Sequence, residues 1–560
     1  MLFNMNWNNR KVTGVLILLF FIFLSFFSVY YTHLLNGEII IGDDIEFHKN
    51  RIEGLYEAIS NGVWFPKLNM IMMNTMGYAS SIFYSDFFLY IPALFRLIGF
   101  SISEAYISFM VIINFFTFVI SFTSFFSIKN SLTKSFLFSL LFTTAPYRLL
   151  DLTTRAALGE LLALTFLPLA FAGLYHILYG KPSKWYFLAI GMTFIIYSHI
   201  LSAVMFALLV AIFLILNTKQ LIKQRERVLS LIYSVVLTIA LTLTYFIPVL
   251  EQTLSQSFKV GNNPIFYMSE KATDLGSLIV NSLSNKGTPN LGILLLIFLV
   301  IYSVIIYKIK DKKIKDIYFV AVLLFIVVTN LFPWKLLDQT FFNTIQFPWR
   351  FLGFVSLLVC WIVAEDPLHW VLKDKKKMAS VCFLCLFLLT SYTVNMRVNA
   401  PDEEVKSYEE FNQLDLSYLG AGKEYLPQSS DYDVLKELPL QPTYDKEQLK
   451  IDDYNKNRDR ISFTFDSESK QKITLPLIYY KGYTAEIAGD GIVSQPFLDK
   501  EENGQLSVIV NGKGEITIQY KETFLQNSML FLSVFSWIVL LNYFIYKYFR
   551  EKSNVIKKKV

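Results

Sequence analysis

The sequence predicts a polytopic α-helical membrane protein with about twelve spans and a β-rich extracellular domain near the C-terminus. Of its 560 residues, 54% are hydrophobic and 52 are phenylalanine, and the mean hydropathy is +0.43. This composition excludes a soluble globular protein. Short loops rich in lysine and arginine separate the apolar runs, and the composition becomes polar between residues 397 and 525.

The first predicted span covers residues 13–33. This apolar run is long enough to cross about 30 Å of hydrocarbon. No small-residue cleavage site follows it, so we expect a retained span and not a signal peptide.

The basic loops predict the orientation of the remaining spans. They lie at residues 10–11, 129–134, 181–184, 219–227, 308–315, 373–377 and 547–559. Because positively charged loops stay on the cytoplasmic side, both termini are expected there. The spans then lie near residues 13–33, 104–127, 135–147, 159–179, 185–199, 200–217, 229–249, 291–307, 317–334, 351–371, 378–396 and 526–546. A full span at 83–100 would turn Lys129 and Lys134 outward, so we predict a re-entrant or interfacial helix.

Several classes of site are not supported by the sequence. The three cysteines, Cys360, Cys382 and Cys385, lie in apolar runs and supply neither a disulfide framework nor a four-ligand zinc site. The five histidines form no HExxH-like motif, so we predict no metal and no other cofactor. The net charge of +6 comes from the basic loops, so no nucleic-acid partner is predicted.

The first outer loop, residues 34–103, carries the most informative charges. If the residues after Gly42 form a helix, Asp44, His48 and Arg51 share one face, with Asp43 adjacent. Ionisable groups beside a membrane indicate a functional site. The alternative is an amphipathic helix at the interface with its charges in water. A divalent cation between Asp43, Asp44 and a substrate phosphate would have the oxygen ligands that it needs, although none is indicated.

Three arginines also lie on the predicted outer face. Arg148, Arg155 and Arg350 are costly there without an anionic partner, and guanidinium groups suit phosphate. For each one alone, the alternative is a salt bridge to Glu160, to Asp151 or to a lipid phosphate. His199 lies where one apolar run passes into the next, so it is either a turn residue or a substrate contact.

The polar segment at 397–525 predicts a small antiparallel β-domain. Strands are expected at 460–466, 472–480, 484–487, 505–511 and 515–520, with turns at 489–491 and 511–514. The loop at 420–427 either folds back over the membrane site or is a plain linker. The predicted domains are thus a transmembrane domain at 1–396, the β-domain at 397–525, and a final helix with a basic tail at 526–560.

The motifs together resemble a known family. They are Asp44-x-x-Phe47-His48-x-x-Arg51, Gly77-Tyr78 with Phe83-Tyr84, Arg155 to Glu160, Ser198-His199, Gln346 to Arg350, and Glu424 to Pro427. Their order resembles, nearly end to end, the bacterial membrane proteins labelled 6-pyruvoyl-tetrahydropterin-synthase-related, close to the YfhO-like proteins. The label is not an activity here, because a pterin synthase needs a zinc-binding histidine cluster. These families look like members of the GT-C superfamily of glycosyltransferases.

The resemblance implies a GT-C-like fold and a transferase that uses a polyprenyl-phosphate sugar. Asp44 matches the position of the general base, with Asp43 as its stand-in, and a single displacement inverts the anomeric carbon. The arginines would stabilise the departing phosphate, and His48 and Arg51 would orient Asp44 or the phosphate. The implied substrate-binding residues are His48, Arg51, Tyr84, Arg148, Arg155, Glu160, His199, Arg350, Glu424 and Tyr425.

Two other function classes remain open. A lipid-phosphate carrier or flippase would use the same basic face, but we see no inverted repeat, and the charges gather at one face instead of the bilayer midplane. A noncatalytic envelope scaffold would need only a membrane anchor, for which about twelve predicted spans are far more than necessary. The acceptor of the transferase is a cell-envelope glycan, such as teichoic acid or another cell-wall polysaccharide, or a protein.

Overall fold

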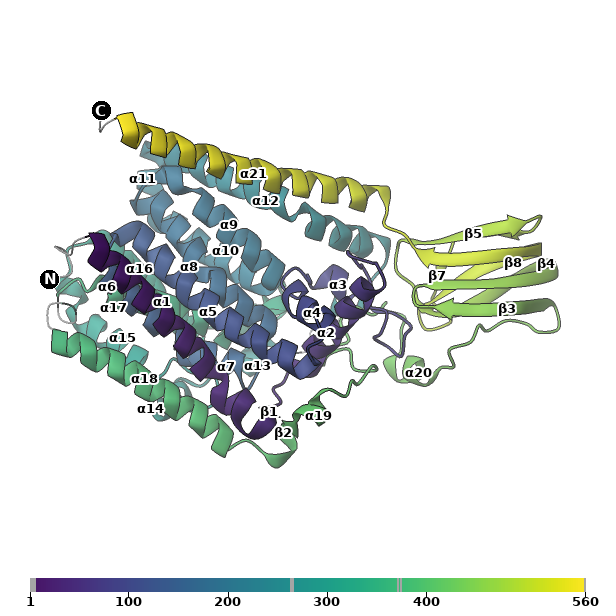
Figure 1. Ribbon diagram of the computed structural model, residues 1–560, viewed down its shortest axis with the longest axis horizontal. Coiled ribbons are helices and arrows are strands. Elements are labelled where there is room, and N and C mark those ends of the chain that lie inside the picture. The colour runs from purple at the N-terminus through teal and green to yellow at the C-terminus, as the bar shows by residue number, and fades with distance from the viewer. Residues whose placement is uncertain (1–6, 262–265, 370–371, 373–374, 558–560) are drawn as a thin grey trace. The chain divides into compact units, whose positions relative to one another are not determined.

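The structure is a computed structural model that describes residues 7–261, 266–369, 372 and 375–557 (Figure 1). The chain divides into two compact units. The first contains Met1–Tyr56, Phe87–Ser234 and Pro264–Asp415, and the second contains Glu57–Asp86, Val235–Asn263 and Leu416–Val560. The three domains predicted from the sequence stay predictions.

Within the described residues, seven helices are long and apolar enough to cross a membrane, by length and composition. They are Lys11–Gly37, Ile102–Lys129, Leu158–Tyr179, Arg225–Ser255, Pro348–Glu365, Lys376–Val398 and Phe524–Arg550. Each coincides with one of the twelve predicted spans. These helices fit a polytopic membrane protein with a β-rich sheet near its C-terminus.

The other five predicted spans correspond to shorter helices. These are α6 (Leu132–Thr143), α9 (Tyr186–Ser198), α10 (Ile200–Leu216), α15 (Ile293–Ile305) and α16 (Lys312–Val327). Helices of this length fall short of the roughly 20 residues that a straight span needs. The count of twelve spans and the orientation therefore stay predictions. In residues 83–100 the structure has only the end of α3 (Ser80–Phe83) and the short α4 (Tyr90–Leu97), in line with the absence of a full span.

The first unit is a helical bundle whose centre is α8 (Leu158–Tyr179). Its other helices include α1 (Trp7–Val29), α5 (Ile102–Lys129), α7 (Pro146–Leu152), α11 (Thr218–Lys223), α13 (Met268–Lys271), α14 (Leu275–Ser284), α17 (Leu352–Glu365), α18 (Lys375–Val398) and α19 (Tyr408–Phe411). Gly173 on α8 and Gly191 on α9 let the two backbones touch, because a Cβ at Gly173 would lie 2.0 Å from the Leu188 nitrogen. This close packing fixes α8, whose first turn carries Glu160.

The segment after the first helix is tied to residues 405–415. Strand β1 (Glu38–Ile40) pairs antiparallel with β2 (Val405–Ser407). Helix α2 (Ile45–Ser60) then follows, and its Lys49 ammonium donates to the carbonyls of Phe411 at 3.0 Å and Gln413 at 2.7 Å. These contacts hold the N-terminal end of α2, where Asp43 and Asp44 lie.

The second unit contains an antiparallel six-stranded sheet. Its order is β3 (Leu449–Asn457), β4 (Arg460–Ile478), β8 (Gln505–Tyr520) and β5 (Tyr483–Gly489), while β6 (Ile492–Val493) and β7 (Phe497–Asp499) also pair with β8. The unit also includes α20 (Tyr432–Glu437) and α21 (Phe524–Lys557), and α12 (Arg225–Ser255) crosses the boundary between the units.

The β-rich composition is confirmed, but the predicted turn at 511–514 is wrong. Strand β8 runs through it, and Gly512 pairs with Ser467 of β4. Gly512 has a φ of +83°, next to a register shift between Ser467 and Gln471 in β4. Glycine therefore accommodates a bulge within two long strands, where the sequence suggested a hairpin turn.

Candidate functional site

Asp43 and Asp44 are exposed carboxylates at the start of α2, on a rigidly held backbone. The amides of Asp43 and Asp44 donate to the carbonyls of Thr154 at 3.1 Å and Arg155 at 3.0 Å. Gly42 allows this approach, because a Cβ there would lie 2.8 Å from the Thr154 oxygen. The backbone thus fixes both carboxylates beside the loop that carries Arg155.

The predicted helical face is confirmed for His48 and Arg51, whereas Asp44 lies just before the helix. The His48 amide donates to the Asp44 carbonyl at 3.1 Å, so Asp44 sits at the helix N-terminus. A carboxylate is favoured at that position. The Arg51 Nη1 lies 3.3 Å from the His48 Nδ1, and both side chains are buried.

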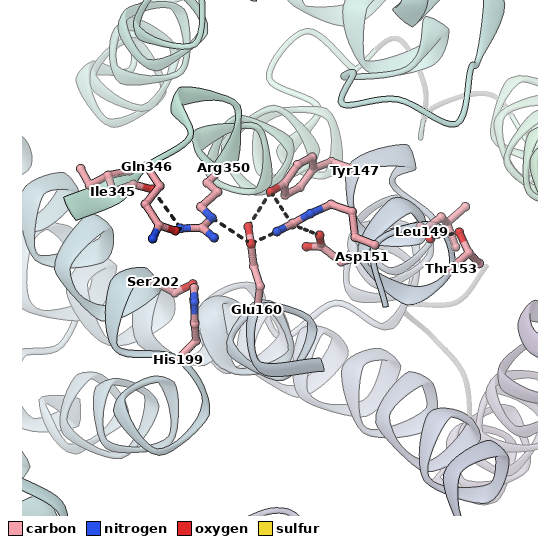
Figure 2. A network of polar contacts seen from close by, with 11 residues as sticks. Tyr147, Leu149, Asp151, Thr153, Glu160, His199, Ser202, Ile345, Gln346 and Arg350 are labelled. Atoms are coloured by element: carbon pink, nitrogen blue, oxygen red, sulfur yellow. Dashed lines mark hydrogen bonds and ion pairs between the residues drawn. The ribbon is translucent and has the colours of Figure 1, made fainter. Parts of the chain in front are cut away.

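Behind these carboxylates lies a buried network centred on Glu160 (Figure 2). Glu160 accepts hydrogen bonds from the Tyr147 hydroxyl at 2.5 Å and from the Arg155 Nη1 at 2.8 Å. The Arg350 Nε lies 3.4 Å from the same carboxylate, and Asp151 also pairs with Arg155. Two buried acids therefore face two buried arginines, which is the arrangement that makes such charges tolerable inside a protein.

The segment Gln346 to Arg350 lays aromatic rings against both arginines. The Arg155 guanidinium lies 4.5 Å from the centre of the Trp349 ring, and that of Arg350 lies 5.1 Å from the Phe347 ring. The Arg350 Nη1 donates to the Ile345 carbonyl at 2.9 Å. The Nε of Arg350 makes no hydrogen bond to any residue that the structure describes, so this guanidinium keeps hydrogen-bonding capacity that an anion could use.

His199 joins the same region. It lies between α9 and α10, and its Nδ1 is 2.9 Å from the Ser202 hydroxyl. Figure 2 shows it next to Glu160, and it interacts electrostatically with Glu160, Arg350 and His48. His199 is both a turn residue and a neighbour of the charged network, so the two interpretations of the sequence are compatible.

The protein environment changes the acidity of the residues at the start of α2. Desolvation raises the pKa of Asp44, and the positive charge of Arg155 partly opposes this effect. The pKa of Asp43 is raised in the same way, although both side chains keep contact with solvent. Burial, together with the Arg51 charge, lowers the pKa of His48 well below its usual value. The site thus combines two carboxyl groups of raised pKa with an imidazole of lowered pKa.

Arg148 makes no hydrogen bond or ion pair to this network among the described residues, although its charge interacts with that of Asp151. It is buried and donates to the Asn114 amide oxygen and the Thr117 hydroxyl, each at 2.8 Å. Both partners lie on α5 and are neutral. The salt bridge to Asp151 or Glu160, which was the alternative for a lone arginine, is formed by Arg155 and Arg350 instead. A substrate role for Arg148 stays a prediction.

Tyr84, Glu424 and Tyr425 belong to the second unit. The Tyr425 ring stacks on Phe83 with centroids 5.0 Å apart, and its amide donates to the Tyr78 hydroxyl at 3.0 Å. These contacts give Tyr425 a packing role inside its own unit. Substrate binding by these three residues, and a loop at 420–427 that folds over the membrane site, stay predictions.

Several members of the network were not chosen from the sequence. Tyr147 precedes the predicted Arg148 in the sequence, and Asp151 was named only as an alternative partner for an arginine. The spacing of Asp151 four residues before Arg155 was the available signal, since such residues meet on one helical turn. Trp349 and Phe347 had no signal except their place in the Gln346 to Arg350 motif. Among the described residues, no three His, Cys, Asp or Glu side chains group as metal ligands do.

No protein-family model and no curated protein sequence matches the chain. Among solved structures, it is similar to the crystal structure of an oligosaccharyltransferase from Archaeoglobus fulgidus in complex with Zn and sulfate. The identity is 14% and the TM-score 0.44, over 73% of this chain and 58% of that one. It is also similar to a cryo-EM structure of the arabinofuranosyltransferase AftD from Mycobacteria, with 13% identity and a TM-score of 0.41, over 69% of this chain and 27% of that one.

The chain spans little more than half of the first protein's length and about a quarter of the second's. Identities and TM-scores at this level assign neither protein's activity to the chain. The resemblance to the YfhO-like family therefore stays a prediction.

Proposed function

We propose that the protein is a membrane glycosyltransferase that moves a sugar from a polyprenyl-phosphate donor to a cell-envelope acceptor on the outer face. The observation that carries the proposal is the exposed Asp44, fixed by backbone contacts beside Arg155 and the Glu160 network. A general base needs access to the acceptor and a fixed position, and Asp44 has both.

The proposed reaction is a single displacement. The Asp44 carboxylate removes the proton from an acceptor hydroxyl, whose oxygen attacks the anomeric carbon of the donor sugar. The bond from that carbon to the lipid phosphate oxygen breaks, and the phosphate leaves with the bonding electron pair. Attack from the opposite side inverts the anomeric configuration.

Charge stabilisation of the leaving phosphate falls mainly to Arg350 in this proposal. Arg155 is held by Asp151 and Glu160, so its positive charge is already balanced at short range. Among the described residues Arg350 has one ion pair, with Glu160 at 3.4 Å, and its Nε makes no hydrogen bond. Positioned cations that meet developing negative charge are among the strongest contributions to catalysis.

Transfer of labelled sugar from a synthetic polyprenyl-phosphate donor to an envelope extract tests the proposal. Purified wild-type protein in lipid nanodiscs is compared with Asp44→Asn and with Asp43→Asn, the matched neighbouring carboxylate. Removal of a general base lowers the rate by about 10² to 10⁴-fold, so we expect that loss with Asp44→Asn alone. NMR of the product reports the anomeric configuration.

Equal transfer by Asp44→Asn and wild type would exclude Asp44 as the base. Loss with Asp43→Asn alone would move the role to its neighbour. No transfer by folded wild type over varied donors and acceptors, with movement of the lipid phosphate across the membrane, would favour a carrier instead.

A further inference from the structure

A cavity of about 640 Å³ lies at the other end of α8 from Glu160. It is formed by the C-terminal ends of α5 and α8, the loop that follows α8, and the start of α16. Glu160 and His176 are sixteen residues apart on α8, which places them about 24 Å apart along the helix axis. The cavity is therefore separate from the candidate site.

The lining of this cavity is strongly basic. It includes Lys129, Lys181, Lys184 and Lys313, and none of its described lining residues is Asp or Glu. Lys129 pairs with Glu365 at 2.6 Å outside the lining, and Lys313 lies 3.4 Å from Asp311. Positive charge thus gathers around an open volume in which acidic side chains are lacking.

Lys181 carries positive charge that no described acid balances, and Lys184 lies close to it in the sequence and in the lining. Lys181 is exposed and has no ion-pair partner in the described part of the chain. The Lys184 ammonium donates to the Ser127 carbonyl at 2.9 Å, which holds it at the rim. Lysines near helix C-termini also interact favourably with the helix dipole, but that effect alone requires no cavity.

A buried imidazole lies within the same lining. His176 is only 3% exposed, and its Nε2 lies 3.1 Å from the Ser127 hydroxyl. Its buried Nδ1 has no hydrogen-bond partner among the described residues. Gly180 leaves space beside this nitrogen, because a Cβ there would lie 2.9 Å from it. A buried polar atom without a partner is costly, and a ligand that bonds to it removes the cost.

We propose that this cavity binds a phosphate group, with Lys181 and Lys184 supplying charge and the His176 Nδ1 supplying a hydrogen bond. The cavity opens at the end of the helices where the basic loops lie, which is the predicted cytoplasmic side. Basic pockets between helices at that surface suit the head groups of anionic lipids. A soluble phosphate compound offers the same chemistry, and the test separates the two sources.

The test measures lipid binding to the full-length protein by native mass spectrometry, with phosphatidylglycerol and phosphatidylcholine as probes. We expect preferential binding of phosphatidylglycerol. Lys181→Gln is expected to weaken it about five-fold, and Lys181→Gln with Lys184→Gln about thirty-fold, since each lysine near the surface contributes about 1 kcal/mol. The control pair, Lys219→Gln with Lys223→Gln, removes two exposed lysines outside the cavity and should change nothing.

Gly180→Ala tests the role of His176 without a change in charge. The added Cβ covers the Nδ1, so we expect phosphatidylglycerol binding to weaken about ten-fold. Competition by inorganic phosphate at millimolar concentration would show that a soluble phosphate is the ligand. Equal binding of both lipids, with no competition by phosphate, would overturn the proposal. So would equal losses in the cavity variants and the control pair. Lys181 is exposed and unpaired, so its single variant stays informative if the others fail to fold.

Discussion

The two ends of α8 hold opposite charge arrangements. At the Glu160 end, Asp151 and Glu160 are buried against Arg155 and Arg350, and Asp43 and Asp44 add two exposed carboxylates nearby. At the His176 end, lysines outnumber the acids that reach them. The first end holds carboxylates in fixed positions, whereas the second leaves positive charge available. Charge removal should therefore act mainly on stability and catalysis at one end, and on ligand binding at the other.

Glu160→Gln should have the largest effect on stability. It removes the carboxylate shared by Arg155 and Arg350 and leaves Arg350 buried without its ion pair. Loss of one partner of a buried pair costs about 3–5 kcal/mol in the free energy of unfolding. Thermal unfolding in detergent measures the change. An unaltered melting temperature would mean that the network is not a stabilising element.

Gly42→Ala should have the second-largest effect on stability. The new Cβ would meet the Thr154 oxygen at 2.8 Å, so the two backbones must separate, at a cost of about 1–3 kcal/mol. Asp44 would move with the segment, so the sugar-transfer rate should fall as well. Gly14→Ala is the matched control, because nothing lies within 4 Å of its added Cβ. Equal effects of the two variants would show that the close approach at Gly42 is unimportant.

The lowered pKa of His48 predicts that the protein loses stability in mild acid. Its pKa is lowered from 6.5 in the folded protein, so the unfolded chain binds more protons as the pH falls below about 6.5. The free energy of unfolding should reach its highest value above that pH and decrease as the pH falls below it. His48→Gln should flatten this dependence in melts between pH 7 and pH 5. A slope that the substitution leaves unchanged would assign the effect to other groups.

Asp43 should tune the acidity of Asp44. The negative charge of Asp43 contributes to the raised pKa of Asp44, so Asp43→Asn should lower that pKa. If ionised Asp44 is the base, the acid limb of the rate profile moves to lower pH in this variant. Transfer rates between pH 4 and pH 8 measure the shift. Movement to higher pH would contradict the proposed coupling.

Lys181→Gln should have the smallest effect on stability. Lys181 is exposed and has no ion pair among the described residues, so the free energy of unfolding should change by less than about 0.5 kcal/mol. The comparison with Glu160→Gln in the same melts contrasts the two ends of α8 directly. A large loss would mean that the basic end stabilises the fold and is not kept open for a ligand.

Part of the candidate site was predictable from the sequence. The motif after Gly42 indicated that His48 and Arg51 share a helical face, and their 3.3 Å contact confirms it. The outer arginines were expected to need acidic partners, and Arg155 and Arg350 have them in Asp151 and Glu160. Arg148 could not be separated from these two, because its neutral partners Asn114 and Thr117 lie about thirty residues earlier, in a different helix.

The prediction of a turn at 511–514 was wrong for a related reason. Asn-Gly and Gly-x-Gly patterns are typical of hairpins, and local sequence does not reveal a partner strand that continues past them. Strand β4 supplies that partner, and Gly512 becomes a bulge position opposite Ser467. The seven long helices needed no such information, since hydrophobic length alone predicts them.

The sequence by itself determined the membrane class, the long helices, the β-rich segment and the residue types that carry charge. These follow from hydrophobicity and local periodicity, which act within one stretch of chain. Only the tertiary structure decided which carboxylate stays exposed, which arginines are already balanced by acids, and which end of α8 holds a buried imidazole nitrogen without a described partner. Those properties depend on the distances between residues far apart in the chain, because burial and charge pairing are set by packing.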